Sequence, residues 1–451
     1  MRLNLPSAAR NPLSLVGVAT ATAMAAMFLV LLALEMAGQL RNPYVGLLLF
    51  VAIPAVFLLG LLLIPVGTWR RRRRLALGGQ REDWPVVDFR VPRTRTVAFT
   101  VAVLTLVNLM IFSLAAYGAV HHMESAAFCG TTCHTTMEPE YSAHQVSPHS
   151  QVACVACHVG PGTEALVASK VAGTRQLWRV VTGNVAAPVA APVRSMRPAR
   201  DTCQSCHWSE KSHGDKLVKV REYADDEASS ETVTTLQLHV GGGRAALGAG
   251  SGIHWHMNID NRIEYIATDA ERQTIPWVKF TDNTGRVREY TVEGTTPEQL
   301  ARGEHRLMDC MDCHNRPAHT FAPSAERAVD TAIAAGLISR ELPFARREVV
   351  AAVTTPYPSK DAALSGIDAR LRAVYSKDAG GSAAKLNSTI AGAQEVYGRN
   401  VFPLMNVGWG TYANHMGHVA FPGCFRCHDD NHTSADGTTI AQDCQSCHDM
   451  P

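Results

Sequence analysis

Residues 118–158 read G-A-V-H-H-M-E-S-A-A-F-C-G-T-T-C-H-T-T-M-E-P-E-Y-S-A-H-Q-V-S-P-H-S-Q-V-A-C-V-A-C-H, and this stretch decides how the rest of the chain is organised. It follows a long apolar run, and it contains the first two of six cysteine pairs that are each followed at once by a histidine. We therefore expect a membrane anchor to lead directly into a cysteine-rich outer part.

The 12 cysteines form six pairs, numbered here as motifs one to six, and none is left over. Five pairs have the form C-x-x-C-H, and motif one has one extra residue between its thiols. The pairs are Cys129 and Cys133, Cys154 and Cys157, Cys203 and Cys206, Cys310 and Cys313, Cys424 and Cys427, and Cys444 and Cys447. The histidines that follow them are His134, His158, His207, His314, His428 and His448.

The C-x-x-C-H pattern is typical of covalent haem c attachment. Two thiols at this spacing form thioethers with the vinyl groups on one edge of a porphyrin, and the next imidazole ligates the iron. Zinc sites also use C-x-x-C pairs, and small secreted domains use disulfides, but neither requires a histidine after every second thiol. The sequence therefore predicts six covalent haems, with the extra residue of motif one bulging out of its loop.

The composition of the chain argues against two classes of protein. With 451 residues, a formal net charge of +2 and 18% charged residues, the chain resembles neither a nucleic-acid binder nor a disordered protein. The apolar residues are concentrated in the first 120 positions, whereas the remainder is polar and rich in glycine and histidine.

Three apolar runs, 13–34, 45–66 and 97–120, each reach the roughly 20 residues that a helix needs to cross the hydrocarbon layer. None contains a charged residue, although buried core helices are the alternative. Five consecutive arginines, 70–74, lie between the second and third runs and place that loop on the cytoplasmic side. We therefore expect an anchor of three transmembrane helices in residues 1–120, contact with membrane lipid, and an outer part in the bacterial periplasm.

The outer part is expected to be a multihaem cytochrome c, mostly helical and irregular, with a small β insert. The expected segments are 121–214 with haems one to three, 215–305 as the β insert, 306–398 with haem four and a helical spacer, and 399–451 with the last two haems. Alternating apolar residues predict strands near 263–267, 275–280 and 286–292, with a hairpin turn at 282–285. Residues 253–256 are expected to put two imidazoles on one side of a strand.

Low-spin multihaem proteins usually place a second histidine on each iron, and the chain has more than enough histidines outside the motifs. The candidates for these distal positions are His144, His149, His254, His256, His319, His415, His418 and His432. A surface or hydrogen-bonded histidine is the alternative for each of them. Met137 is a candidate ligand for the first iron, whose potential a thioether would raise, although most methionines only fill a core.

Phe128 and the residues after it, F-C-…-C-H-…-M-…-P-E-Y-…-H followed by C-x-x-C-H, resemble the NapC/NirT/NrfH quinol dehydrogenases. The resemblance covers mainly residues 97–207. The later stretches D-C-M-D-C-H-N-R-P-A-H (309–319) and F-P-G-C-F-R-C-H (421–428) are similar to larger inner-membrane multihaem cytochromes of metal-respiring bacteria. The chain departs from the family in having three expected spans instead of one, six motifs instead of four, and an extra residue in both intervals of motif one.

The resemblance implies that menaquinol or ubiquinol is oxidised beside haem one and that electrons pass to a periplasmic redox protein or reductase. Lys170 is the nearest match to a lysine of the quinol pocket in relatives, with a solvated surface lysine as the alternative, and Glu138 or Glu140 could accept protons. The ligands of the first iron stay open between His134, Met137 and a carboxylate. Two other functions also stay open: an electron-relay subunit without a quinol site, and a terminal reductase with an open haem, for which no C-x-x-C-K motif is present.

Overall fold

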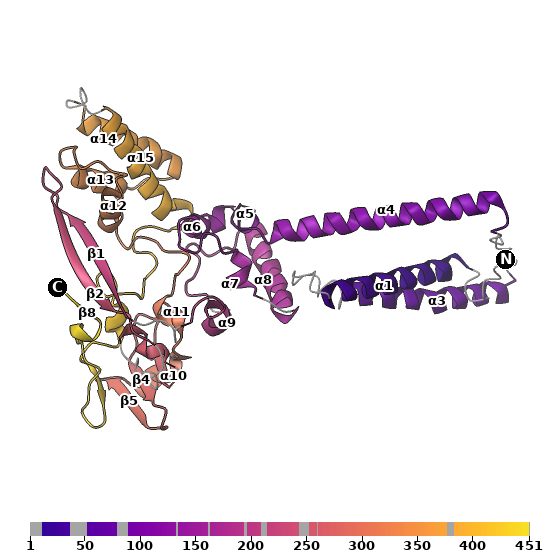
Figure 1. The fold of residues 1–451 in the computed structure, drawn as a ribbon, viewed down its shortest axis with the longest axis horizontal. Helices are drawn as coiled ribbons and strands as arrows, with labels where there is room; N and C mark the ends of the chain where they lie inside the picture. Colours follow the sequence, from indigo (N-terminus) through magenta and orange to yellow (C-terminus); the bar gives the residue numbers. More distant parts are fainter. Residues whose placement is uncertain are drawn as a thin grey trace. The chain divides into compact units, whose positions relative to one another are not determined.

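The computed structural model describes residues 11–36, 52–78, 89–131, 134–160, 163–193, 196–208, 214–242, 252–258, 260–376 and 383–450. The chain divides into two compact units. The first comprises Met1–Ser125 and Val159–Leu177, and the second comprises Ala126–His158 and Trp178–Pro451. Figure 1 labels many of the helices and strands of both units.

The first unit is built from helices. These are α1 (Pro12–Met36), α3 (Ile53–Ala76), α4 (Pro92–Met123) and most of α8 (Thr163–Val181), whose end extends into the second unit. Helices α1 and α3 pack closely because small residues face each other: a Cβ on Gly17 would come within 2.6 Å of the Gly60 carbonyl oxygen. Ser14 also donates a hydrogen bond to the Ile64 carbonyl oxygen at 2.8 Å. Small contact residues of this kind are typical of helices that associate in a bilayer.

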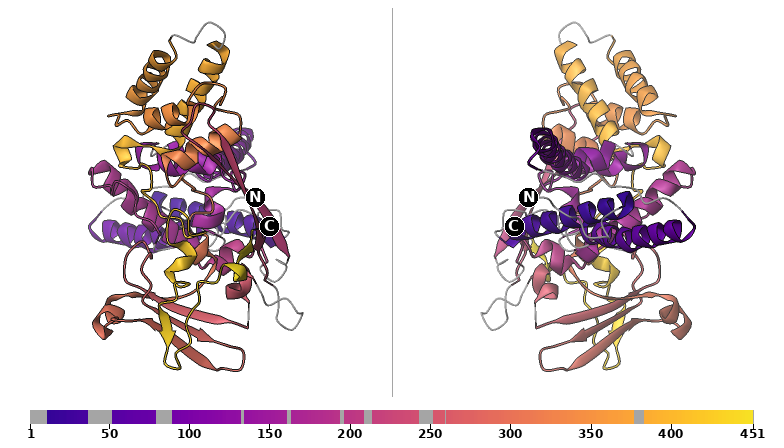
Figure 2. Two further views of the ribbon diagram at one scale, coloured as in Figure 1. Left: turned by 90° about the vertical axis from the view of Figure 1, so that its left-hand side faces the viewer. Right: turned by 90° about the vertical axis from the view of Figure 1, so that its right-hand side faces the viewer.

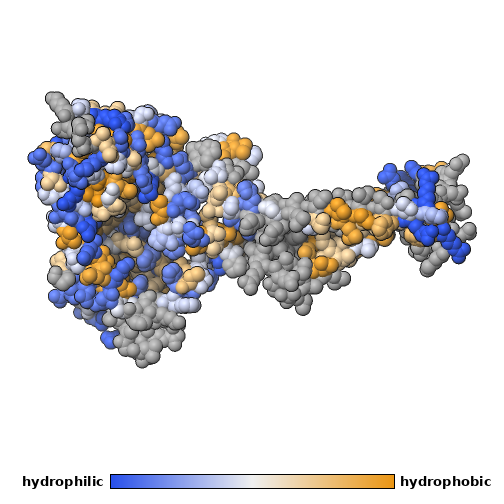
Figure 3. Space-filling view, turned by 45° about the horizontal axis from the view of Figure 1, so that its top comes forward, coloured by the Kyte–Doolittle hydropathy of each residue, from blue (hydrophilic) through white to orange (hydrophobic). Residues whose placement is uncertain are grey.

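The expected three spans are only partly matched. Among the described residues, one helix, Ile53–Ala76, is long and apolar enough to cross a membrane, and Pro12–Phe28 is a shorter apolar helix. The third apolar run lies in α4, where many of the side chains fall outside the described residues. Figure 3 shows apolar side chains on the visible face of these helices and a hydrophilic group at one end. The structure thus supports a membrane anchor near the N-terminus, with one span and a shorter apolar helix instead of three spans.

The second unit contains two antiparallel sheets. One has the order β1 (Asp215–Tyr223), β2 (Glu231–His239), β8 (His448–Asp449). The other has the order β6 (Glu304–Leu307), β3 (Arg262–Ala267), β4 (Trp277–Thr281), β5 (Val287–Val292), β7 (His432–Ser434). The three strands expected near 263–292 are present as β3, β4 and β5, and Asp282 accepts the Thr284 and Arg286 amides in the turn before β5.

The β structure is more extensive than the expected small insert. The hairpin β1–β2 is additional, and the C-terminal residues add one strand to each sheet, with Val292 opposite His432 and Leu238 opposite His448. The overall class is therefore mixed α/β instead of mostly α and irregular. Residues 253–256 were expected as a strand, and this was wrong, because they form the 3₁₀ helix η5 (Ile253–Met257) after Gly252, which has a φ of 79°.

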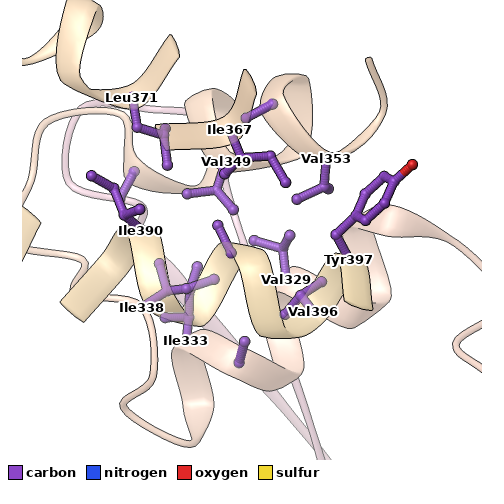
Figure 4. Close-up of a cluster of buried hydrophobic side chains, with 14 of the residues drawn as sticks. Val329, Ile333, Ile338, Val349, Val353, Ile367, Leu371, Ile390, Val396 and Tyr397 are labelled. Atoms are coloured by element: carbon purple, nitrogen blue, oxygen red, sulfur yellow. The ribbon is translucent and has the colours of Figure 1, made fainter. Parts of the chain in front are cut away.

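Four helices form the densest apolar core of the second unit. They are α12 (Ala325–Ala334), α13 (Ala345–Val353), α14 (Lys360–Val374) and α15 (Ala383–Asn400), in agreement with the helical spacer expected there. Val329, Val349, Ile367 and Ile390, one from each helix, are at most 4% exposed and converge in the centre (Figure 4). Figures 1 and 2 show these helices at one end of the second unit and the five-stranded sheet at the other.

Short elements carry the cysteine motifs through the same unit. They are α5 (Ala126–Thr131), α6 (His134–Gln145), α7 (Cys154–His158), α9 (Ala199–Cys203), α11 (Cys310–Cys313), η7 (Gly423–Arg426) and η8 (Cys444–Ser446). Two other short helices, α10 (Pro297–Arg302) and η6 (Pro403–Met405), contain no motif residue. Gly423 has a φ of 52°, and a Cβ there would overlap the Gly417 carbonyl oxygen. Only glycine therefore fits at the residue that leads into motif five.

Candidate haem sites

Motifs two to six begin with a shared local geometry, a short helical turn. In motifs three, four and five, the histidine amide donates to the carbonyl of the first cysteine, at 2.8, 2.8 and 3.0 Å for His207, His314 and His428. Residues three apart lie on one face of such a turn, so the two thiols share a side. This arrangement presents both sulfur atoms to one planar group, as covalent haem attachment requires.

Consecutive motifs are neighbours in space. The thiols of motifs one and two, two and three, three and four, four and five, and five and six lie close enough to influence each other's charge. The motifs are therefore arranged in space in the same order as in the sequence. None of the cysteines that the structure describes is in a disulfide, and Cys133 lies outside the described residues.

Five motif histidines each face a second imidazole at an almost constant distance. The distances between ring centres are 6.2 Å for His158 and His319, 6.1 Å for His207 and His149, 6.3 Å for His314 and His254, 5.7 Å for His428 and His256, and 6.3 Å for His448 and His418. Each pair joins one motif residue to one of the expected distal histidines.

This distance is the one expected for two imidazoles on opposite sides of one metal ion. A metal–nitrogen bond of about 2 Å on each side, with about 1 Å more from the nitrogen to each ring centre, separates the centres by about 6 Å. Directly stacked rings would be closer. Among the described side chains, no group of three or more His, Cys, Asp or Glu residues is arranged to hold a metal ion, so the geometry is one of pairs and not of zinc-like clusters.

The second ring nitrogens also suit iron ligands. The Nδ1 atoms of His149, His319, His256 and His428 contact the backbone carbonyls of Pro317, Glu140, Ile253 and Ala441 at 2.8–3.2 Å. Such a contact fixes the proton on Nδ1 and leaves Nε2 as the free donor atom, as is usual for metal-bound imidazoles. The buried Nδ1 atoms of His254 and His448 have no hydrogen-bond partner in the described part of the chain.

Burial keeps several of these imidazoles neutral, which is the form that binds a metal. Burial lowers the pKa of His254, His256 and His314 below the ordinary value for histidine. Burial also lowers the pKa of His319, although the nearby Glu140 carboxylate acts in the opposite direction. The site is thus prepared for metal binding by its surroundings. The residues present fit covalent haem with two axial imidazoles at five motifs.

Two of the expected distal histidines have a different environment. Both ring nitrogens of His415 contact backbone carbonyls, those of Asp312 at 3.0 Å and Glu271 at 3.1 Å. His432 contacts the Asp429 carboxylate at 2.8 Å and the Ile275 carbonyl at 2.7 Å. Neither residue keeps a nitrogen for iron in this arrangement, because tertiary contacts use both. Proximity in sequence to motifs five and six made them candidates.

His144 and the residues of motif one stand apart from the five pairs. His144 is buried, its Nε2 contacts the Val152 carbonyl at 3.0 Å, and its ring centre lies 6.1 Å from that of His319, which also faces His158. Met137 is half-buried in α6, one turn after His134. The side chain of His134 lies outside the described residues.

The residues expected at a quinol site fall in both units. Lys170 belongs to α8 in the first unit, and its side chain lies outside the described residues. In the second unit, Glu138 accepts a hydrogen bond from Lys360 at 2.7 Å. Glu140 accepts two bonds from Arg316, at 2.7 and 2.9 Å. Both carboxylates are therefore engaged in ion pairs.

Two buried charges inside the motifs were not recognised from the sequence. Asp312 of motif four is 1% exposed, and Arg426 of motif five is 9% exposed. The sequence contains a signal that could have identified them. Each is a charged residue at the position before the second cysteine, where motifs two, three and six have the uncharged residues Ala156, Ser205 and Ser446.

The chain was also compared with known proteins. The model of the NapC/NirT cytochrome c family, N-terminal region, matches residues 91–241. Over 448 residues, the chain is 40% identical to the cytochrome c-type protein ImcH of Geobacter sulfurreducens, and the alignment covers 98% of this chain and 88% of ImcH. No solved structure matches the chain.

Proposed function

Because the chain belongs to the NapC/NirT cytochrome c family, we propose that it oxidises quinol at the outer face of the bacterial inner membrane and passes electrons through six haems to a periplasmic acceptor. Membership in the family makes it a c-type cytochrome of membrane electron transfer. The observation that supports electron transfer through the haems is the set of five imidazole pairs, one at each of motifs two to six, with ring centres about 6 Å apart.

In this proposal, the protein holds and orients the redox groups. The two cysteines of each motif would hold one haem c, and at motifs two to six the histidine after them would supply one iron ligand. His319, His149, His254, His256 and His418 would supply the second ligand at motifs two to six, in that order. Bound haem supplies reversible one-electron chemistry at its iron.

The membrane anchor sets which face the redox part occupies. The run Arg70–Arg74 ends α3 and is retained on the cytoplasmic side by the positive-inside rule. The proposal places the motifs on the opposite, periplasmic side.

Quinol oxidation releases two electrons and two protons, so the proposed site needs a hydrogen-bonding group and a proton acceptor beside motif one. Lys170 is proposed to hold the quinol oxygen on the resemblance to the family alone. Glu138, in the second unit, is assigned to accept a proton. Glu138 suits this role better than Glu140, because its side chain is 43% exposed and has a single lysine partner. Glu140 is 15% exposed and held at both oxygens by Arg316.

A second candidate function is an electron-relay subunit of a larger respiratory complex. The ion pairs of Glu138 and Glu140 favour it, because both carboxylates already have cationic partners within the protein. In that case the apolar helices serve only as an anchor, and another protein supplies the electrons.

Stopped-flow reduction of the detergent-purified full-length protein by a menaquinol analogue, followed at the haem α-band, separates the two functions. The quinol proposal predicts rapid reduction that Lys170→Ala slows at least tenfold. Arg175→Ala is the matched control, because Arg175 is an exposed cation of the same helix, turned about 140° away. If dithionite reduces every haem and quinol reduces none, the relay function is correct.

A further inference from the structure

Arg426 is a buried cation between motifs four and five, numbered 310–314 and 424–428. Its guanidinium donates three hydrogen bonds: to Gly423 O at 2.8 Å, to Arg272 O at 2.9 Å and to Asp312 O at 2.7 Å. The last of these joins the interior of motif five to the interior of motif four. Arg426 is 9% exposed, so solvent screens it little.

The positive charge of Arg426 is not neutralised by a close carboxylate. All three of its partners are backbone carbonyls, and no carboxylate in the described part of the chain forms an ion pair with it. The nearby Asp312 carboxylate is occupied elsewhere: it accepts from Tyr265 at 2.6 Å, from Arg306 at 2.9 Å and from the Asp309 amide at 2.7 Å. A buried charge with only dipolar partners is costly, so it is a candidate for a functional role.

The charge of Arg426 acts on a neighbouring side chain outside the motifs. Burial and the Arg426 cation together lower the pKa of His415 to about 4.

The sequence singles out this junction. Asp312 and Arg426 are the charged residues that lie between the two cysteines of any motif; the intervening residues of the other four are uncharged. The two lie in adjacent motifs and have opposite signs. The Asp312 carboxylate is paired with Arg306 at 2.9 Å, whereas Arg426 has no carboxylate partner in the described part of the chain.

We infer that Arg426 stabilises an added electron on the redox groups held by motifs four and five, which makes this junction a preferred resting point for electrons on their way to motif six. This inference rests on the proposed attachment of haem to the motifs, and it does not require a quinol site. Each step adds one electron, which comes from quinol or from a reduced redox partner protein, and no bond or proton changes at Arg426. The guanidinium acts only through its charge, because Arg is never deprotonated under these conditions.

Spectroelectrochemical titration of the full-length protein, with haem counted by the pyridine haemochrome, tests the inference. For Arg426→Gln, we expect about one third of the haem, the two groups of six, to become harder to reduce. At a fixed applied potential, their reduced-to-oxidised ratio should fall about tenfold, which is a 59 mV shift for one electron. Arg426→Lys keeps the charge and should shift the ratio less than threefold. Arg370→Gln, which removes an exposed cation of α14, should leave the curve unchanged.

The outcomes separate this inference from the proposed function. The inference is overturned if the titration curve of Arg426→Gln overlays the wild-type curve. It is also overturned if the curve of Arg426→Lys is displaced as far as that of Arg426→Gln, because the effect would then be structural. If the Arg426→Gln protein does not incorporate haem, the Asp312→Asn variant provides the test. Removing this negative charge should make the same third of the haem easier to reduce, and an unchanged titration curve overturns the inference. A wild-type protein with fewer than six haems contradicts the proposed function instead.

Discussion

His254 and His256 lie on one 3₁₀ turn, yet they face the histidines of two different motifs, 6.3 Å from His314 and 5.7 Å from His428. If both serve as distal ligands, His254→Ala opens one iron of six, so about one sixth of the haem becomes high-spin in the oxidised protein. His256→Ala should do the same, and the double variant should convert about one third. Because the two sites are separate, the effects should add.

The assay is the quantitative electron paramagnetic resonance spectrum of oxidised protein, normalised to haem content. His415→Ala is the matched control, since His415 is equally a histidine near motif five but contacts two backbone carbonyls. It should give no high-spin signal. It should nevertheless destabilise the fold, because each buried carbonyl left without a partner costs about 1–3 kcal/mol.

Two results would refute the reasoning. One is an unchanged low-spin spectrum in both His254→Ala and His256→Ala, which would mean that other groups ligate these irons. The other is a high-spin signal in His415→Ala, which would mean that the hydrogen bonds of His415 do not reflect its role. Either result would show that ring-to-ring distance does not identify the ligands here.

Two further predictions concern stability. Ile367→Ala, at a fully buried position among α12–α15, should lower the free energy of unfolding by about 2–5 kcal/mol in urea, whereas Leu364→Ala on the same helix, 39% exposed, should cost under about 1 kcal/mol; equal losses would contradict the described core. The hydrogen bond from Arg272 lowers the pKa of Glu304, so this pair stabilises the fold above the unfolded pKa of Glu304 and loses that contribution as the pH falls. The stability difference between wild type and Glu304→Gln should therefore shrink between pH 6 and pH 3, and a difference that is constant with pH would count against the pair.

Local signals in the sequence were sufficient for part of this structure. Alternation predicted β3, β4 and β5, and alanine-rich amphipathic segments predicted the helices of the spacer, because these patterns depend on neighbours within one element. The short helical turn at each motif is likewise local. The strands β7 and β8 were not predicted, because each has two or three residues and forms only against a partner more than 100 residues away.

The sequence could not predict which histidines pair, because the partners are also far apart in the chain. His256 and His428 are brought together by the fold of the intervening sheet, so sequence could nominate His256 but not assign its partner. The fold also places two of the expected distal ligands, His415 and His432, in contact with backbone carbonyls and an aspartate, so their ring nitrogens are already occupied. A polar side chain near a motif can thus belong to the scaffold instead of the metal site.

The most direct test of the central claim is the near-infrared magnetic circular dichroism spectrum of the oxidised wild-type protein, normalised per haem. This spectrum distinguishes irons with two imidazoles from irons with one imidazole and a thioether or an oxygen. The account predicts five irons per chain with two imidazoles, one for each histidine pair, and a separate contribution from motif one. Fewer than five such irons in a protein that carries its full complement of haem would contradict it.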